Sequence, residues 1–323
     1  LIMKNAPIKI SAAANVALIK YWGKTDLEKN IPAAPSLSVG IEDLRTDTII
    51  SESRGDTDTL IGKFKKSDEQ RILNYVSMAK KLLGVSGGLE IETENNFPAS
   101  SGLASSASGF AAIALGIDKF YGLDMPREDI SRLARLGSGS AARSIYGGFV
   151  QMNTGPDPFA TPLMAEDPWP LDILVLVTEE QPKKMSSTDS MNLTKDTSPF
   201  YSAWLDTQEA DFQKAKDALE EKDFWKLAQI SEHNCLKMHS TIMTSKPPHV
   251  YWNPTTLEIL HQVQKIQKKA LRVFFTIDAG PQVKLICDPS DTQRILEQFE
   301  SMSGISRRIV TKVGGEPRIE QLG

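Results

Sequence analysis

The spacing of apolar and polar positions predicts strands and helices along the first half of the chain. Apolar-rich runs typical of strands occupy residues 7 to 22 and 44 to 51. From 67 to 84, apolar residues recur at helical spacing up to a glycine, which predicts an amphipathic helix. A strand at 88 to 96 then runs into a serine- and glycine-rich segment. The apolar run that begins at Phe110 predicts a buried helix after it.

The same patterns continue through the second half. A helix is predicted at 125 to 140, and a short helix that turns into a strand at 144 to 153. Two strands around a turn are expected at 273 to 287, followed by a final helix and strand. Long helices are expected at 199 to 221, 223 to 240 and 254 to 270. Strands and helices are mixed in both halves, which indicates an α+β fold.

Length and local breaks suggest two lobes. The chain has 323 residues, more than a single core usually supports. Pro168 and Pro170 precede a buried strand at 171 to 178, so the boundary is expected there. The predicted lobes are 1–169 and 170–323.

Composition narrows the class of protein. The net charge is −4 and no block of Lys or Arg occurs, so we expect no nucleic-acid partner. No apolar run approaches the roughly 18 residues of a membrane span, so no membrane partner is expected. The N-terminus lacks a signal-peptide core, and only Cys235 and Cys287 occur, which favours a cytoplasmic protein.

The segment NNFPASSGLASSASGF at 95–110 is a candidate anion site. Small residues before an apolar helix leave backbone N–H groups and room for an anion at the helix N-terminus. The segment lacks the G-K-[ST] of a P-loop, which excludes a Walker site here. A tight packing turn is the structural alternative. The candidate residues are Ser100, Ser101, Gly102, Ser105, Ser106 and Ser108.

Two cation-bearing segments are also candidates. In ALIKYWGK at 17–24, an extended backbone places Lys20, Trp22 and Lys24 on one face, and a solvated edge strand is the alternative. In LGSGSAARSIYGGF at 136–149, Ser138 is a candidate cap for a helical turn. Arg143 offers a bidentate guanidinium to a carboxylate or phosphate. A flexible turn with a solvated arginine is the alternative there.

Asp278 ends a buried strand in FFTIDAGP. It is an ordinary turn residue by local chemistry, yet strand ends also carry catalytic acids and bases. His233, Cys235 and His239 resemble a metal pattern, but His233 lies off the helical face of the other two. We therefore expect no zinc site and assign no protein ligands to a metal.

Four segments, in this order along the chain, closely resemble the mevalonate diphosphate decarboxylases of the GHMP kinase superfamily. They are APIKISAAANVALIKYWGK, NNFPASSGLASSASGF, GSGSAARSIYGGF and TIDAGP. PSLSV (35–39) and KKMSSTDSM (183–191) also look like family segments. The resemblance spans about residues 7 to 290. It implies a two-lobed GHMP-kinase-like α+β fold, with a ribosomal-S5-like N-terminal lobe and a ferredoxin-like C-terminal lobe.

The resemblance also implies a reaction. Family members decarboxylate (R)-5-diphosphomevalonate to isopentenyl diphosphate with ATP and Mg²⁺, releasing ADP, phosphate and CO2 in the mevalonate pathway of isoprenoid biosynthesis. The serine-rich loop then binds ATP, and a homodimer is expected. Asp278 acts on the C3 hydroxyl with Lys20 beside it. The implied substrate-binding residues are Tyr21, Trp22, Gly23, Lys24, Arg71, Ser138, Gly139, Ser140, Arg143 and Thr188, of which Arg143 is also assigned to catalysis.

The sequence departs from relatives at two positions, and it leaves rival functions open. Thr188 stands where some bacterial relatives carry arginine, and Gln282 where many carry asparagine. The rivals are a phosphomevalonate decarboxylase, a mevalonate kinase-type enzyme and a non-catalytic binding protein of the same fold. Lys20 and Asp278 together argue against a kinase alone, and their presence with the loop argues against a non-catalytic protein.

Overall fold

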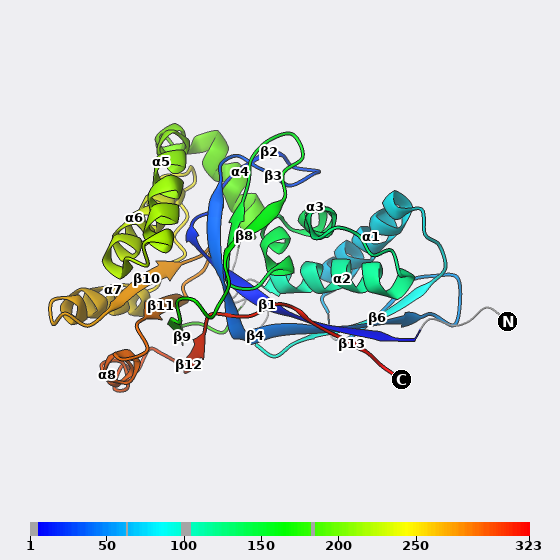
Figure 1. Ribbon diagram of the computed structural model, residues 1–323. Coiled ribbons are helices and arrows are strands. Elements are labelled where there is room, and N and C mark those ends of the chain that lie inside the picture. The colour runs from blue at the N-terminus through cyan, green and yellow to red at the C-terminus, as the bar shows by residue number, and fades with distance from the viewer. Residues whose placement is uncertain (1–5, 63, 98–104, 182–184) are drawn as a thin grey trace.

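The computed structural model describes residues 6–62, 64–97, 105–181 and 185–323 (Figure 1). Within this part of the chain a seven-stranded sheet is built on two long antiparallel strands, β1 (Ile8–Ile19) and β4 (Ser36–Glu52). The sheet order is β13-β1-β4-β6-β5, and β7 and β8 extend it from β4. These strands are β5 (Thr59–Ile61), β6 (Leu89–Asn95), β7 (Phe149–Met152), β8 (Ala160–Met164) and β13 (Arg318–Gln321).

Helices cover one face of this first sheet. Figure 1 shows α1, α2 and α3 gathered on that side. The central α2 is apolar on nearly all sides and packs on β1 and β4 within one buried cluster. Gly84 ends α1 in a left-handed conformation, as the sequence predicts. The elements are α1 (Lys66–Leu83), α2 (Ser105–Tyr121), α3 (Arg127–Gly137) and the 3₁₀ helix η1 (Gly139–Ile145).

The second lobe carries an antiparallel sheet in the order β10-β11-β9-β12. Its strands are β9 (Asp172–Val177), β10 (Val273–Ile277), β11 (Val283–Cys287) and β12 (Arg307–Lys312). Its helices are α4 (Ser187–Thr197), α5 (Tyr201–Glu220), α6 (Phe224–Met243), α7 (Pro254–Gln267) and α8 (Thr292–Glu297). A short hairpin of β2 (Lys24–Asp26) and β3 (Ile31–Pro32) follows β1.

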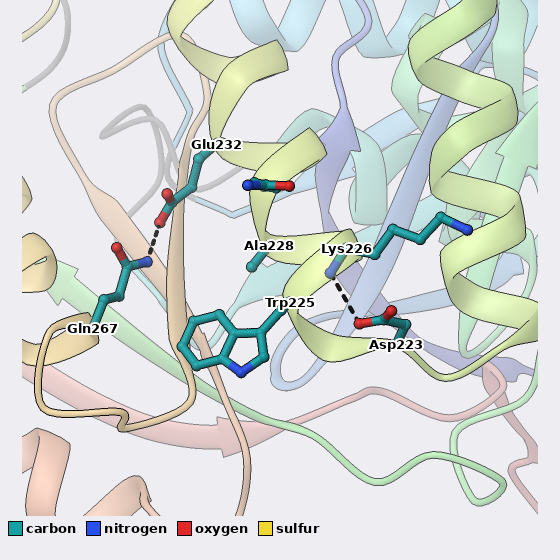
Figure 2. Close-up of a pocket in the computed structure, with 7 residues that line it drawn as sticks. Asp223, Trp225, Lys226, Ala228, Glu232 and Gln267 are labelled. Carbon is teal, nitrogen blue, oxygen red and sulfur yellow. Dashed lines mark hydrogen bonds between the residues drawn. The ribbon is translucent and has the colours of Figure 1, made fainter.

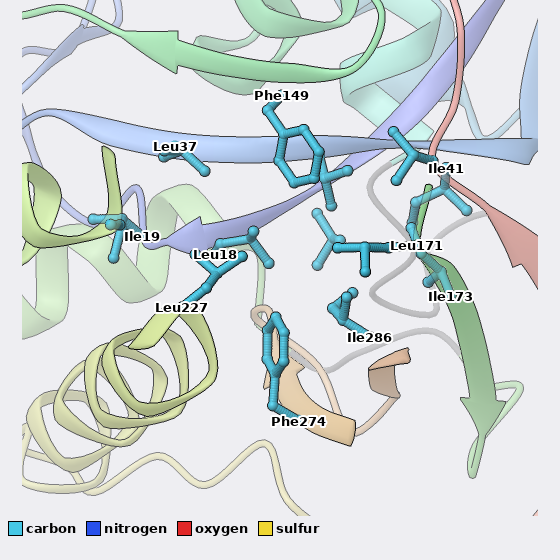
Figure 3. Packing of buried hydrophobic residues seen from close by; sticks show 14 of the residues in the cluster. Leu18, Ile19, Leu37, Ile41, Phe149, Leu171, Ile173, Leu227, Phe274 and Ile286 are labelled. Carbon is cyan, nitrogen blue, oxygen red and sulfur yellow. The ribbon is translucent and has the colours of Figure 1, made fainter. Parts of the chain in front are cut away.

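A shared core joins the two sheets (Figure 3). Alternation along β10 and β11 sends Phe274 and Ile286 into this core, while Phe275 packs in an outer cluster with α7 and α8. By the same alternation Thr276 and Lys284, which are paired across the two strands, face the first lobe. The Thr276 hydroxyl donates to Ala17 O of β1 at 2.9 Å. The ends of β1 and β10 therefore lie side by side.

Most predicted elements are present, and the boundaries show what the sequence missed. The three long helices of the second half are confirmed. The strand predicted at 7 to 22 ends at Ile19, and that predicted at 44 to 51 is only the second half of β4. Residues 36–41 are buried on both faces, so they lack the alternation that marks a strand. Among the described residues no helix is long and apolar enough to cross a membrane.

The last strand alters the simple division into lobes. β13 lies near the C-terminus, yet it pairs with β1 in the first sheet, with Ile8 opposite Gln321. The predicted division at residue 169 therefore does not describe the path of the final residues. Strand pairing between positions 307 to 313 residues apart leaves no local signal in a short, exposed strand.

Candidate active site

Asp278 lies between two lysines where the lobes meet. It follows β10, and Lys20 follows β1. The Lys20 ammonium is 2.8 Å from Asp278 Oδ1, and the Lys284 ammonium is 3.6 Å from Oδ2. The lysine side chains are 1% and 2% exposed, while that of Asp278 is 22% exposed. Burial alone would raise the pKa of Asp278, but the two lysines lower it to about 2.

A buried polar network fixes the backbone of Lys20. Its N–H donates to Asn234 Oδ1 at 2.8 Å, and its carbonyl accepts from Gln208 Nε2 at 2.7 Å. Asn234 Nδ2 in turn donates to Gln208 Oε1 and to Asp211 Oδ2. Helices α5 and α6 of the second lobe therefore determine where the Lys20 ammonium lies. None of these three supporting residues was expected from the sequence.

Arg143 is buried in η1, so the alternative of a solvated turn arginine is wrong. Its Nε donates to Ser38 Oγ at 2.8 Å, and its Nη1 to Ser36 Oγ at 2.7 Å. Asn15 Oδ1 lies 3.4 Å from Nη2. These partners are neutral, and burial lowers the pKa of Arg143 to about 10. The guanidinium is thus held by uncharged oxygens rather than by a carboxylate.

Lys24 is also buried, so the solvated edge strand is wrong for this segment. Its ammonium donates to Asn30 Oδ1 at 2.7 Å and to Thr188 Oγ1 at 3.2 Å. Burial, followed by the charge of Arg71, lowers the pKa of Lys24 to about 8. Thr188, expected near the substrate, therefore lies beside Lys24. The two residues come from β2 and α4, which belong to different lobes.

Trp22 packs in a buried aromatic cluster, and its expected contact with substrate stays a prediction. Its ring is 3% exposed and lies among Tyr201 and Trp204, and its carbonyl accepts from Trp204 Nε1. Neighbouring Gly23 has φ +102°, and a Cβ there would collide with the Tyr201 hydroxyl. These two residues shape the turn between Lys20 and Lys24.

The 138–140 segment faces the start of α2. Ser138 Oγ lies 3.2 Å from Ser140 Oγ and 3.3 Å from Ser106 Oγ. Ser138 is the N-cap residue of η1, but its side chain makes no cap hydrogen bond, contrary to the prediction. Gly139 is in contact with Tyr21, since a Cβ would collide with the Tyr21 hydroxyl. The ring of Tyr21 lies 5.9 Å from the Arg143 guanidinium carbon.

The nucleotide-loop candidates divide into three groups. Ser100, Ser101 and Gly102 lie outside the described residues. Ser105 and Ser106 form the first turn of α2 and are partly exposed. Ser108 is fully buried and its hydroxyl is 2.6 Å from Thr46 Oγ1, so its side chain is directed at the sheet. Helical geometry turns this third serine toward the sheet.

Arg71 of α1 is tied to the same region. It donates to Gly137 O at 2.7 Å, and its guanidinium carbon lies 4.7 Å from the centre of the Phe110 ring. Its role toward a substrate stays a prediction.

His239 and Cys235 both contact the backbone of Ile277. His239 Nε2 lies 3.1 Å from Ile277 O, and Cys235 Sγ accepts from Ile277 N–H at 3.3 Å. Both therefore stabilise the free edge of β10, one residue before Asp278. Across the described ranges no group of three His, Cys, Asp or Glu side chains suits a metal ion.

An open cavity of about 570 Å³ lies along α6, away from these groups (Figure 2). Glu232 Oε1 accepts there from Gln267 Nε2 and from the Phe275 N–H of β10. Burial raises the pKa of Glu232 to about 7. The residues that line the cavity are Asp223, Trp225, Lys226, Ala228, Gln229, Glu232 and Gln267. None of them was expected at a functional site from the sequence. Glu232 thus holds β10 by a hydrogen bond, and no residue of the candidate active site lines this cavity.

The arrangement suits a small molecule with several negative charges. Lys20 and Lys284 share one carboxylate, Asp278, whereas buried Lys24 and Arg143 have only neutral oxygens as hydrogen-bond partners among the described residues. Buried cations without carboxylate partners favour anionic ligands. A two-lobed α+β fold with such a site defines a small-molecule enzyme of the GHMP type.

Comparison with known proteins identifies the family. Residues 12–161 match the diphosphomevalonate decarboxylase-like N-terminal domain, and residues 173–320 match the mevalonate 5-diphosphate decarboxylase C-terminal domain. The chain is 32% identical over 349 residues to diphosphomevalonate decarboxylase of Candida albicans, covering 96% of each chain. For the Saccharomyces cerevisiae enzyme the identity is 33%, covering 94% and 84%. The chain belongs to the diphosphomevalonate decarboxylase family.

Solved structures confirm the expected fold. Mevalonate diphosphate decarboxylase from Staphylococcus aureus superposes with a TM-score of 0.91 at 34% identity, over 98% of each chain. A complex of a protein named MDDEF with MVAPP, AMPPCP and magnesium gives 0.90 at 33% identity, over 98% of this chain and 99% of that one. The family membership that the four sequence segments indicated is therefore confirmed.

Proposed function

We propose that the chain catalyses the ATP-dependent decarboxylation of (R)-5-diphosphomevalonate to isopentenyl diphosphate, with release of ADP, phosphate and CO2. The observation that carries this proposal is Asp278 between two lysine ammonium groups at the junction of the lobes. Membership of the diphosphomevalonate decarboxylase family supports the substrate and the reaction.

Asp278 is proposed to orient the C3 hydroxyl of the substrate and to receive its proton. The hydroxyl oxygen bonds to the γ-phosphorus of ATP as the bond to ADP breaks. Because the pKa of Asp278 is about 2, the carboxylate is ionised at neutral pH and is a weak base. Its main contribution is therefore alignment of the hydroxyl, which suits the loose transition state of phosphoryl transfer.

The second step needs no further base. The C3–O bond breaks, phosphate leaves, and cationic character develops at C3. The electron pair of the bond between the carboxylate carbon and C2 then forms the alkene, and CO2 leaves. Lys20 is proposed to lie beside the reacting oxygen, where a positive charge stabilises the departing phosphate.

The unpaired cations are proposed to hold the rest of the substrate. Arg143 provides a planar fork for a carboxylate or phosphate, and Lys24 provides a compact charge. Ser138, Ser140 and Thr188 add hydroxyl groups near them. Gly139, Tyr21 and Arg71 border this part of the site.

The N-terminal turn of α2 is proposed to bind the ATP phosphates. Ser105 and Ser106 are partly exposed there, and free N–H groups at a helix start suit an anion. Magnesium prefers phosphate oxygens and water to a full set of protein ligands, so it fits this site with ATP. When bound, it neutralises phosphate charge. Ser105→Glu is expected to weaken ATP binding, because it adds negative charge to that turn.

Three candidate substrates distinguish the proposed reaction from its rivals. The purified chain is incubated with ATP, Mg²⁺ and either mevalonate, its 5-phosphate or its 5-diphosphate, while ADP and CO2 are measured. We expect both products only with the diphosphate. CO2 from the monophosphate would favour a phosphomevalonate decarboxylase, and ADP without CO2 would favour a kinase.

From the resemblance we also propose a homodimer, and from the N-terminus and the cysteine content a cytoplasmic location. From Pro168 and Pro170 we propose a boundary between the lobes at residue 169, with β13 belonging to the first sheet. Light scattering of the purified chain measures its mass, and a monomer at micromolar concentration would contradict the first of these.

A further inference from the structure

The two oxygens of Asp278 have separate cationic partners. Lys20 approaches Oδ1 from the end of β1, and Lys284 approaches Oδ2 from β11. Lys284 is opposite Thr276 in the β10–β11 ladder, on the face that looks toward the first lobe. Its neighbours Val283 and Leu285 point to the outer core instead. Strand alternation alone therefore directs this lysine at the carboxylate.

A second buried lysine beside Asp278 lowers the stability of the folded protein unless its charge is compensated. Lys20, Lys284 and Arg143 lie near one carboxylate, and all three are almost fully buried. Like charges oppose one another in such a site, and each buried ion loses hydration. Lys20 contacts only Oδ1 of Asp278, and Lys284 provides the positive charge beside Oδ2. The charge of Asp278 would therefore still be partly compensated if Lys20 moved away.

We propose that Lys284 is a positioning residue that keeps the Asp278 carboxylate ionised and oriented while Lys20 engages the reacting oxygen. This inference rests on the proposed function. As Lys20 turns toward the substrate, its hydrogen bond to Oδ1 weakens. Lys284 remains on Oδ2 and prevents Asp278 from becoming an uncompensated buried charge.

The other titratable groups around Asp278 do not replace Lys284. On α6, the Cys235 thiol has a pKa raised by burial, and burial lowers the pKa of His239 to about 3. Both are neutral near pH 7. Arg143 of η1 contributes a smaller effect than Lys284. Loss of Lys284 is therefore expected to raise the pKa of Asp278.

Lys284→Met tests the inference through pH dependence. The variant keeps most of the side-chain volume and removes the charge. We expect the acid limb of kcat, measured with saturating ATP and diphosphomevalonate, to move up by about 1 to 3 pH units. Lys284→Arg keeps the charge and is expected to restore much of the wild-type profile. Lys312→Met removes an exposed lysine of the same sheet and is the matched control.

An acid limb unchanged in Lys284→Met would overturn the inference, as would an equal shift in Lys312→Met. If Lys284→Met fails to fold, Lys284→Gln provides the same loss of charge with a polar side chain. The pKa of Asp278 is also measured directly by carbon-13 NMR titration, with Asp278→Asn assigning the signal. This readout needs no turnover, so it separates failure of the inference from an inactive wild type, which would refute the proposed function.

Discussion

Lys20 and Lys24 lie four residues apart, and both are buried, at 1% and 8% exposure. They differ in the groups that surround the positive charge. Lys20 forms an ion pair with Asp278, whereas the Lys24 ammonium donates to the neutral oxygens of Asn30 and Thr188. Within the described residues Lys24 forms no ion pair. The same short segment therefore presents one compensated and one uncompensated ammonium group.

Arg143 resembles Lys24 in this respect. Serine hydroxyls and an amide oxygen surround it, and burial lowers its pKa, as it does for Lys24. Neutral oxygens reduce the cost of a buried charge but do not cancel it. An anionic ligand removes the remaining cost, so binding energy is available at these two residues. The Lys20–Asp278 pair is already compensated and is suited to chemistry rather than affinity.

The largest expected effect follows from breaking the compensated pair. Asp278→Asn is nearly isosteric but has no charge and accepts no proton. We expect turnover to fall at least ~10²-fold while both ligands still bind. ADP and CO2 formation should fall together, because phosphorylation precedes decarboxylation. Full ADP formation without CO2 would move Asp278 to the second step, and near wild-type activity would return it to a turn residue.

Arg143→Lys acts on the uncompensated set. It keeps a positive charge but loses the planar fork, so we expect the KM for diphosphomevalonate to rise at least about tenfold. The kcat should change less than the KM, because the reacting oxygen lies elsewhere. Steady-state kinetics measure both. A change in thermal stability with an unaltered KM would show that Arg143 has a structural role only.

The protonation of Lys24 gives a pH test. Its pKa is lowered from 10.5 to about 8, so the ammonium is lost between pH 8 and 10.5 in the folded protein while the unfolded chain stays charged. The burial penalty is then relieved, so this residue raises the free energy of unfolding as pH increases through that window. If Lys24 holds the substrate as proposed, we expect substrate binding to weaken over the same pH range. We expect kcat/KM to fall by up to about tenfold from pH 7 to pH 9.

Lys24→Arg is the matched control for that profile, because arginine stays charged. Its kcat/KM should remain level over the same pH range, whatever its absolute value. The same decline in the variant as in the wild type would assign the effect to another group.

The smallest expected effect concerns the neutral oxygens. Ser38→Ala removes the acceptor of Arg143 Nε and leaves that donor without its 2.8 Å partner. We expect the free energy of unfolding to fall by about 2 kcal/mol, the usual size for a hydrogen bond to a charged group, with kcat little changed. Chemical denaturation measures the first. A loss of turnover comparable to that of Asp278→Asn would mean that the compensated and uncompensated sets are not separate.

The sequence predicted much of the site but not its supports. Asp278, Lys20 and Arg143 were singled out, and they are close together. Ser108 and Trp22 were assigned to ligands, but both side chains pack in the interior. Lys284 was missed, although a lysine inside the apolar strand VKLIC is a visible signal. Asn234 and Gln208 gave no signal, because a polar residue on a helix shows nothing of its distant partner.

By itself the sequence determined most of the helices (though not α4), the glycine that ends α1, and the order of the four segments typical of the family. These features depend on neighbouring residues, so local spacing carries them. The family resemblance placed Lys20 beside Asp278, which lies 258 positions away, but only the tertiary structure showed that Lys284 reaches the other carboxylate oxygen while Lys24 has neutral partners. Only the tertiary structure likewise showed that β13, near the end of the chain, pairs with β1. Charge compensation depends on which side chains meet in space, and residues four apart can meet entirely different neighbours.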